Sequence, residues 1–275
     1  MTGHSGPLDF VSVTFLITIS AAGFLAPWIA PLSPSGIDAD RLLESPSASH
    51  WMGTDELGRD LFSRTLFGAR VSLTVGIATA LVAMAVGSLY GLVSGYVGGK
   101  FDELLMRVVD IFYALPDLVL IILVSIVTGR TVVGAIIALS LITWVRFARL
   151  VRGQVLQIME LPYIDGARAA GAGASRILLH HILPNLMGPL LVTLTFSVPS
   201  AILAESTLSF IGLGINDPYS PWGISWGTLA QDGWRAMRSH PHLVFFPGAA
   251  IFSTILALNF VGDSFRNRID PRMKV

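Results

Sequence analysis

Long apolar runs constrain this chain more than any other feature of its sequence. They cover residues 10–31, 71–99, 108–128, 131–150, 182–214 and 243–262. About 20 apolar residues in a helix cross the ~30 Å hydrocarbon core of a bilayer. Backbone groups in a bilayer must hydrogen-bond within the protein, and these runs lack the alternation of barrel strands. The sequence therefore predicts an all-α membrane protein with six transmembrane helices.

The composition supports a membrane protein and excludes several classes of function. Hydrophobic residues make up 53% of the chain and charged residues 13%, whereas a soluble domain carries about 25% charged residues. The absence of cysteine excludes disulfides and thiolate chemistry. The formal net charge is zero, which gives no electrostatic reason to expect nucleic acid as a partner. Residues 1–9 lack the Lys or Arg of a signal peptide, so the first apolar run is predicted to be retained.

The distribution of Lys and Arg predicts the orientation. An even number of spans puts both termini on one side, and eleven of the 18 Lys and Arg residues fall on that side. Cytoplasmic loops carry this excess, so both termini are predicted to be cytoplasmic. The predicted organisation is a cytoplasmic N-terminus (1–9), a first transmembrane helix (10–31), an external loop (32–69), a five-helix core (70–265) that includes a cytoplasmic loop (151–182), and a cytoplasmic tail (266–275).

The loop between the fourth and fifth spans contains "YIDGARAAGAGASRILLHHILPN", which is too polar to cross a membrane. On a helix, Ala167, Ala170, Gly171 and Ala174 fall three and four residues apart, which leaves one face nearly bare. Glycine costs about 1 kcal/mol inside a helix, so Gly171 and Gly173 predict a short helix, a bend and a second short helix. A helix lying on the membrane would present bulky apolar residues. Close contact with another protein is therefore favoured.

This loop resembles the cytoplasmic loop of permease subunits in ATP-binding-cassette importers, written roughly E-A-A, three residues, G, nine residues, I-x-L-P. The pattern falls on Asp165, Gly166, Ala167 and Gly171, with Asp and Gly in place of the usual Glu and first Ala. The stretches "GTDELGRDLFSRTLFGARVSLTVGI" and "ESTLSFIGLG" are similar to the dipeptide, oligopeptide and nickel permeases, particularly the second of their two permease subunits.

The resemblance implies a permease with a cytoplasmic coupling helix between helices 4 and 5, which docks on an ATPase subunit. The residues it implicates in coupling are Asp165, Gly166, Ala167, Arg168, Ala170, Gly171 and Ala174. The implied partners are a second, homologous permease in a heterodimer, one or two cytoplasmic ATP-binding subunits, an external solute-binding protein and the lipid bilayer. The implied cargo is a peptide or a related polar solute such as a nickel complex. The implied location is the cytoplasmic membrane of a prokaryote.

No catalytic or cofactor-binding pattern is found in the sequence. A phosphate loop reads G-x-x-x-x-G-K-[ST], and the nearest string, "SGYVGGKF", has Ser94 and Phe101 at two of the required positions. We therefore predict a non-catalytic chain without a cofactor, with ATP and Mg bound by partner subunits. The pairs 180–181 and 240–242 offer two histidines each, too few for a metal site, and none is predicted.

Ionisable residues within the apolar runs are candidates for function, because a charge at the bilayer centre costs on the order of 3 kcal/mol on insertion scales. Asp110 has Arg107 three residues before it, which predicts an ion pair on one helix. Asp117 follows Pro116 and is either a local hydrogen-bond acceptor or part of the solute route.

Glu205 is the acid deepest in an apolar run. Together with Ser206, Ser209 and Asp117 it is a candidate for the translocation pathway, and the alternative is a structural contact with the partner permease. Two other functions stay open from the sequence. An ion-coupled secondary transporter could use Asp110, Asp117 and Glu205 as a relay, although we find no internal duplication. A membrane scaffold could recruit a cytoplasmic protein and move no solute.

The string "DELGRD" at residues 55–60 lies in the predicted external loop. Its acids and Arg59 are spaced for bonds to one another. We interpret the string as a short outer helix with local bonds, in preference to a docking site for a binding protein.

Overall fold

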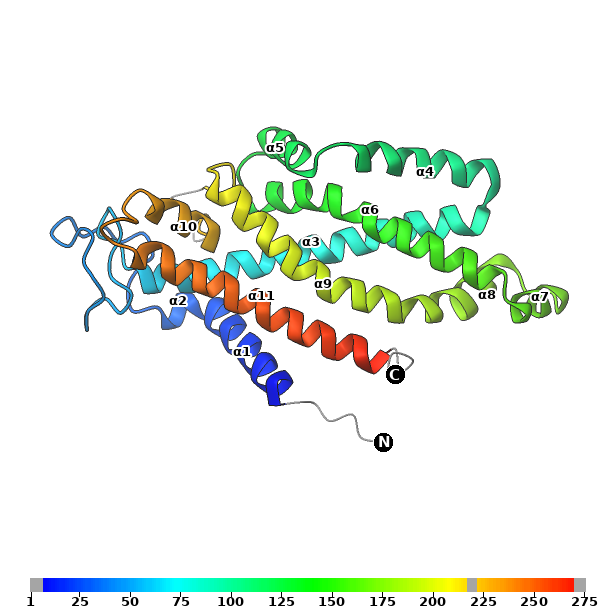
Figure 1. Cartoon of the computed structure of the whole chain (residues 1–275), viewed down its shortest axis with the longest axis horizontal. Helices are drawn as coiled ribbons and strands as arrows, with labels where there is room; N and C mark the ends of the chain where they lie inside the picture. Colours follow the sequence, from blue (N-terminus) through cyan, green and yellow to red (C-terminus); the bar gives the residue numbers. More distant parts are fainter. Residues whose placement is uncertain (1–6, 217–221, 270–275) are drawn as a thin grey trace.

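The computed structural model describes residues 7–216 and 222–269. Within these ranges all regular secondary structure is helical, and one isolated bridge joins Thr54 to Asp60. The long helices lie side by side along the longest axis of the molecule (Figure 1). In chain order the elements are α1 (Pro7–Phe24), α2 (Ala26–Ile29), α3 (Leu61–Val97), α4 (Gly99–Ala114), α5 (Asp117–Thr128), α6 (Val132–Met159), α7 (Pro162–Ala169), α8 (Ala174–Ile177), the π-helical turn η1 (Leu178–Ile182), α9 (Leu183–Phe210), α10 (Trp226–Trp234) and α11 (His242–Ile269).

The all-α class is confirmed, but the predicted number of spans is not. Within the described ranges, four helical runs are long and apolar enough to cross a membrane: α3, α6, α8 to α9, and α11. The bent pair α4 and α5 could form a fifth span. The apolar part of α1, Leu8–Phe24, is shorter than these helices. The sixth predicted span therefore stays a prediction.

The third predicted span, 108–128, is wrong as a single helix. α4 ends at Ala114 and α5 begins at Asp117, and the two helix axes differ by 92°. Pro116 has no backbone N–H to donate and disfavours helical geometry at the residue before it. Leu115 is accordingly extended, with φ −88° and ψ 141°. Asp117 therefore lies at a bend and not within a continuous helix.

Two helices extend beyond their predicted limits. α6 continues to Met159, so Arg146, expected near the end of span 131–150, lies in the middle of the helix. α3 begins at Leu61, inside the predicted loop 32–69, because the Asp60 carboxylate accepts a hydrogen bond from the Ser63 backbone N–H at 2.7 Å. Such a cap satisfies one of the free N–H groups at a helix start.

Glycines bring α3 and α6 into close contact. Gly87, Gly91 and Gly95 recur every fourth residue along α3. A Cβ atom would lie 2.3 Å from the Trp144 carbonyl oxygen at Gly87 and 2.3 Å from the Ala148 carbonyl oxygen at Gly91. Small residues at this spacing allow the backbones of membrane helices to approach one another. The two helices therefore pack backbone against backbone at the centre of the molecule.

The molecule has two structurally distinct ends (Figure 1). One, which we call the α7 end, carries α7 and α8. The other, the α10 end, carries α10 and the loops between α2 and α3. The ends of the described chain lie together, because Ser264 on α11 donates a hydrogen bond to Asp9 on α1. This contact agrees with the prediction that the two termini share a side.

Candidate functional site

The α7 segment has the predicted form of a short helix, a bend and a second short helix. At the end of α7, the Gly171 N–H donates to the Arg168 carbonyl and the Ala172 N–H to the Ala167 carbonyl, both at 2.9 Å. This pair of bonds is the Schellman motif, which requires a left-handed residue after the helix. Gly171 supplies it with φ +81°. The glycine is therefore needed for the backbone of the turn.

The predicted bare helical face is not present, because the turn at Gly171 interrupts the helix. Ala167 is half-buried, whereas Ala170, Gly171 and Ala174 are exposed. No heavy atom of the rest of the chain lies within 4 Å of a Cβ atom placed on Gly166 or Gly171. The small residues therefore form an open surface around the turn.

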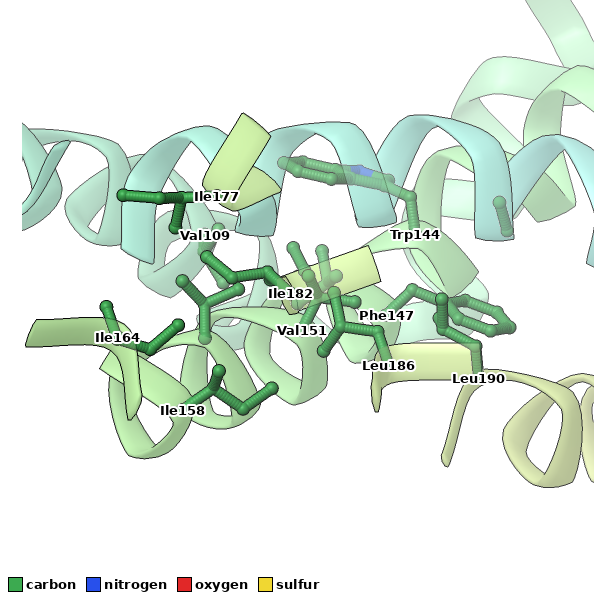
Figure 2. Close-up of a cluster of buried hydrophobic side chains, with 14 residues drawn as sticks. Val109, Trp144, Phe147, Val151, Ile158, Ile164, Ile177, Ile182, Leu186 and Leu190 are labelled. Carbon is green, nitrogen blue, oxygen red and sulfur yellow. The ribbon is translucent and has the colours of Figure 1, made fainter. Parts of the chain in front are cut away.

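Beneath this surface the α7 segment is anchored in the main hydrophobic core (Figure 2). Ile164 of α7 and Ile177 of α8 are 0% and 2% exposed. They belong to one cluster with Ile158 of α6, Ile182 of η1 and Leu186 of α9. Protein cores are close-packed and transmit displacement. A movement of α7 would therefore be passed to α6 and α9.

The charged residues of α7 are exposed. Arg168 donates to the Asp165 carboxylate at 3.1 Å, and the two side chains are 46% and 71% exposed. Asp165 lies in the first turn of α7, where a negative charge is favourable. An exposed pair of this kind contributes at most about 1 kcal/mol to stability. Both side chains remain accessible to a partner, and their role in coupling stays a prediction.

Asp110 pairs with a different residue from the one predicted. Its carboxylate accepts a hydrogen bond from Arg149 of α6 at 2.8 Å, and the predicted pair with Arg107 is not formed. The Arg149 guanidinium also lies over the Tyr113 ring, 4.1 Å from its centroid. The sequence argument was wrong because it considered neighbours on one helix only. The pair instead joins α4 to α6.

A cavity of about 570 Å³ lies between the bend of α4 and α5, α6 and α9. Its charged lining residues are Asp117, Arg146 and Arg149, and its hydroxyl groups belong to Thr143 and Ser200. Within residues 7–216 and 222–269 the Asp117 side chain has no hydrogen-bond partner, so it is not the local acceptor considered from the sequence. The sequence argument missed Arg146, because the fourth span was taken to end at residue 150.

The other pathway candidates lie away from this cavity. Glu205 is fully buried, and its carboxylate accepts hydrogen bonds from Ser209 at 2.6 Å and Ser72 at 3.5 Å. The Trp226 backbone N–H donates in turn to Ser72 at 3.1 Å. Burying a carboxylate requires such partners. These bonds tie α9 to α3 and α10, and a pathway role for Glu205, Ser206 and Ser209 stays a prediction.

At the α10 end, residues 55–60 form a turn and not the helix expected. Gly58 has φ +74°. The Asp55 carboxylate accepts hydrogen bonds from the Leu57 and Arg59 N–H groups, both at 2.9 Å, and from the Arg59 side chain at 2.7 Å. It also pairs with the buried Arg64. The predicted local bonds are therefore confirmed, although they form in a turn.

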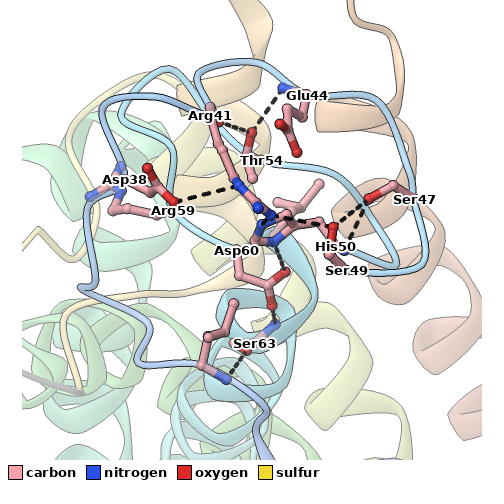
Figure 3. A network of polar contacts seen from close by, with 12 residues as sticks. Asp38, Arg41, Glu44, Ser47, Ser49, His50, Thr54, Arg59, Asp60 and Ser63 are labelled. Atoms are coloured by element: carbon pink, nitrogen blue, oxygen red, sulfur yellow. Dashed lines mark hydrogen bonds and ion pairs between the residues drawn. The ribbon is translucent and has the colours of Figure 1, made fainter.

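A second set of polar contacts fastens the neighbouring loop to the start of α3 (Figure 3). The Asp60 carboxylate, which caps α3, also lies 3.0 Å from the Nδ1 atom of His50. The Thr54 hydroxyl accepts from the Glu44 N–H at 2.8 Å and donates to the Arg41 carbonyl at 2.5 Å. The loop is therefore held by its own side chains.

Comparison with known proteins identifies the family. Residues 87–275 match the model described as the binding-protein-dependent transport system inner membrane component. The chain belongs to this family. It is 40% identical to the oligopeptide transport system permease protein OppC of Bacillus subtilis, over 98% of this chain and 88% of that protein. It is 44% identical to the dipeptide transport system permease protein DppC of the same organism, over 91% and 79%. The glutathione transport system permease protein GsiD of Pectobacterium atrosepticum is 39% identical, over 94% and 85%.

Solved structures confirm the fold. An inward-facing structure of the MetNI methionine ABC transporter matches with a TM-score of 0.61 at 16% identity, over 76% of this chain and 96% of the matched chain. The fold is that of type I importer permeases. The protein is a multi-pass membrane subunit of an ATP-binding-cassette importer and is non-catalytic. The family resemblance found in the sequence is thereby confirmed.

Proposed function

We propose that this permease forms a heterodimer with a second, homologous permease and carries short peptides across the cytoplasmic membrane of a prokaryote. One or two cytoplasmic ATPase subunits bind ATP and Mg and contact the α7 end, and an external solute-binding protein delivers peptide to the α10 end. The observation that carries the proposal is the α7 segment, which is exposed on its outer surface and anchored below by Ile164 and Ile177. The names of the relatives support a peptide cargo.

The α7 segment acts in this proposal as a coupling helix. Closure of the ATPases on ATP moves α7, and the core cluster carries that movement to α6 and α9, which shifts the pathway between two arrangements. The residues that meet the ATPase are Asp165, Gly166, Ala167, Arg168, Ala170, Gly171 and Ala174.

The proposed topology follows the distribution of Lys and Arg. Residues 1–9 and 266–275 are cytoplasmic, and residues 32–69 are external down to the start of α3. Asp117 lines the solute pathway. The bonded group around Glu205 and Ser209 supports the wall behind it, because its carboxylate is already satisfied by this chain.

Reconstitution tests this function directly. The permease is purified with its natural partners and placed in liposomes, and uptake of a labelled dipeptide is measured with the solute-binding protein present. We expect uptake that requires ATP and stops when the phosphate-loop lysine of the ATPase is replaced. Uptake driven by an ion gradient without the ATPase would overturn the proposal in favour of a secondary transporter. A complex that binds the ATPase but shows no peptide-stimulated ATP hydrolysis would favour a scaffold.

The absence of native cysteine allows a second test. Ala170→Cys would be the only thiol in the chain, and we expect it to cross-link to an ATPase subunit and to react with membrane-impermeant reagents only from the cytoplasmic side. Val133→Cys, exposed at the opposite end of α6, is the matched control. It should react only from outside and form no cross-link to the ATPase. The reverse pattern would contradict the proposed orientation.

A further inference from the structure

The position of Arg146 calls for a physical explanation. It lies fourteen residues after Val132, the first residue of α6, which places it about 21 Å along the helix. That depth falls within the ~30 Å of a hydrocarbon core, where a charge facing lipid is costly. Its side chain is nevertheless exposed in this chain and lines the cavity beside the bend of α4 and α5. The guanidinium must therefore face water, a partner or a solute.

The charges of this cavity are only partly compensated by the chain. Arg149 is matched by Asp110 and lies over Tyr113. Across the described ranges, by contrast, neither the Asp117 carboxylate nor the Arg146 guanidinium takes part in an ion pair or a hydrogen bond. The two residues come from different elements, α5 and α6. The cavity thus presents one free acid and one free base.

We infer that the cavity binds a short zwitterionic peptide, with Asp117 receiving its free amino terminus and Arg146 its free carboxylate. This inference rests on the proposed function, since the cavity must lie on the solute pathway. A volume of about 570 Å³ falls in the range of about 300–1,000 Å³ typical of small-molecule sites. The hydroxyl groups of Thr143 and Ser200 are available to peptide groups, and Leu139 and Ala204 provide apolar wall.

Other ligand classes fit these charges less well. A divalent cation would be repelled by Arg146, and within the described ranges no three His, Cys, Asp or Glu side chains come together as metal ligands. A simple anion would be repelled by Asp117. Only a ligand with separated opposite charges uses both residues. Charge-assisted hydrogen bonds to each end would be stronger than neutral ones.

Direct binding in the absence of the solute-binding protein tests the inference. The probes are trialanine, N-acetyl-trialanine and trialanine amide, titrated against the purified complex of permeases and ATPases. We expect trialanine to bind about tenfold more tightly than either blocked peptide. Asp117→Asn should remove the preference for a free amino terminus and leave the preference for a free carboxylate. Arg146→Gln should do the reverse.

Glu103→Gln and Arg107→Gln are matched controls, because both residues are exposed on α4 and neither lines the cavity. They should leave both preferences intact. Equal affinity of the wild-type complex for all three peptides, no binding of any, or an equal loss of all three in Asp117→Asn and Arg146→Gln would overturn the inference. Unfolding midpoints in detergent verify that both variants are folded. ATP-driven uptake by the complete system is measured separately, so failure here is distinguishable from failure of the proposed function.

Discussion

The two ends of the molecule treat their charged side chains in opposite ways. At the α10 end, Asp55, Asp60 and Arg64 are 9%, 3% and 4% exposed and are bonded within the chain. At the α7 end, Asp165 and Arg168 are 71% and 46% exposed and bond only to each other and, from Arg168, to the Met159 sulfur at 3.7 Å. The first end is completed by its own residues. The second is anchored in the core but leaves its surface free.

This difference separates two kinds of consequence for substitutions. Removing a buried, bonded group leaves its partner uncompensated, which destabilises the fold. Removing an exposed group changes the fold little but alters the surface that a partner meets. We therefore expect substitutions at the α10 end to reduce stability and those at the α7 end to reduce coupling. The following variants are ordered from the largest expected effect on stability to the smallest.

Asp55→Ala should have the largest effect. It removes the acceptor of two backbone N–H groups and leaves the buried Arg64 with Asp232 alone among the described residues. Breaking a buried ion pair of this kind costs about 3–5 kcal/mol. The unfolding midpoint in detergent should fall clearly below that of Asp40→Ala, an exposed control on the same loop. Equal midpoints for the two variants would remove the contrast between the ends.

Gly171→Leu should have an intermediate effect. The left-handed backbone at residue 171 costs a bulky side chain about 1–3 kcal/mol, so the turn between α7 and α8 should be distorted and peptide-stimulated ATP hydrolysis lost. Gly171→Asn is the matched variant, because asparagine tolerates this conformation. It should retain most of the coupling. A Gly171→Leu protein with normal coupled uptake would show that the turn geometry is dispensable.

Ala170→Leu separates the surface from the backbone. Residue 170 is exposed and has φ −78°, so leucine introduces no backbone strain. We expect an unchanged unfolding midpoint in the absence of the ATPase and a loss of peptide-stimulated hydrolysis in the assembled complex. Ala85→Leu, exposed on α3 far from α7 in the sequence, should change neither measurement. Retention of full coupling by Ala170→Leu would argue that the ATPase contacts another surface.

Arg168→Ala should have the smallest effect on stability. The pair that it removes is exposed at both side chains, and such pairs contribute at most about 1 kcal/mol. The unfolding midpoint should therefore stay within error of wild type. A fall comparable to that of Asp55→Ala would show that the α7 end depends on its own polar contacts as strongly as the α10 end does.

The sequence by itself determined what depends on local chemistry. Apolar runs predicted the all-α membrane class because a bilayer accepts few alternatives. Gly171 and Gly173 predicted the bend after α7, since glycine weakens a helix wherever it lies. The loop pattern at Asp165 to Gly171 and two further stretches identified the family before any contact was known. Each of these features is carried by residues close together in the chain.

Only the tertiary structure decided which residues meet. It paired Asp110 with Arg149 across two helices, buried Glu205 among hydroxyl groups from α3 and α9, and placed Arg146 opposite the bend at Asp117. Pro116 marked an interruption, but the 92° angle follows from how α4 and α5 pack on their neighbours. Periodicity assigns a residue to a face of its own helix and carries no information about the helix opposite. The partners of the charged residues, and hence the free pair in the cavity, are set by packing between distant segments.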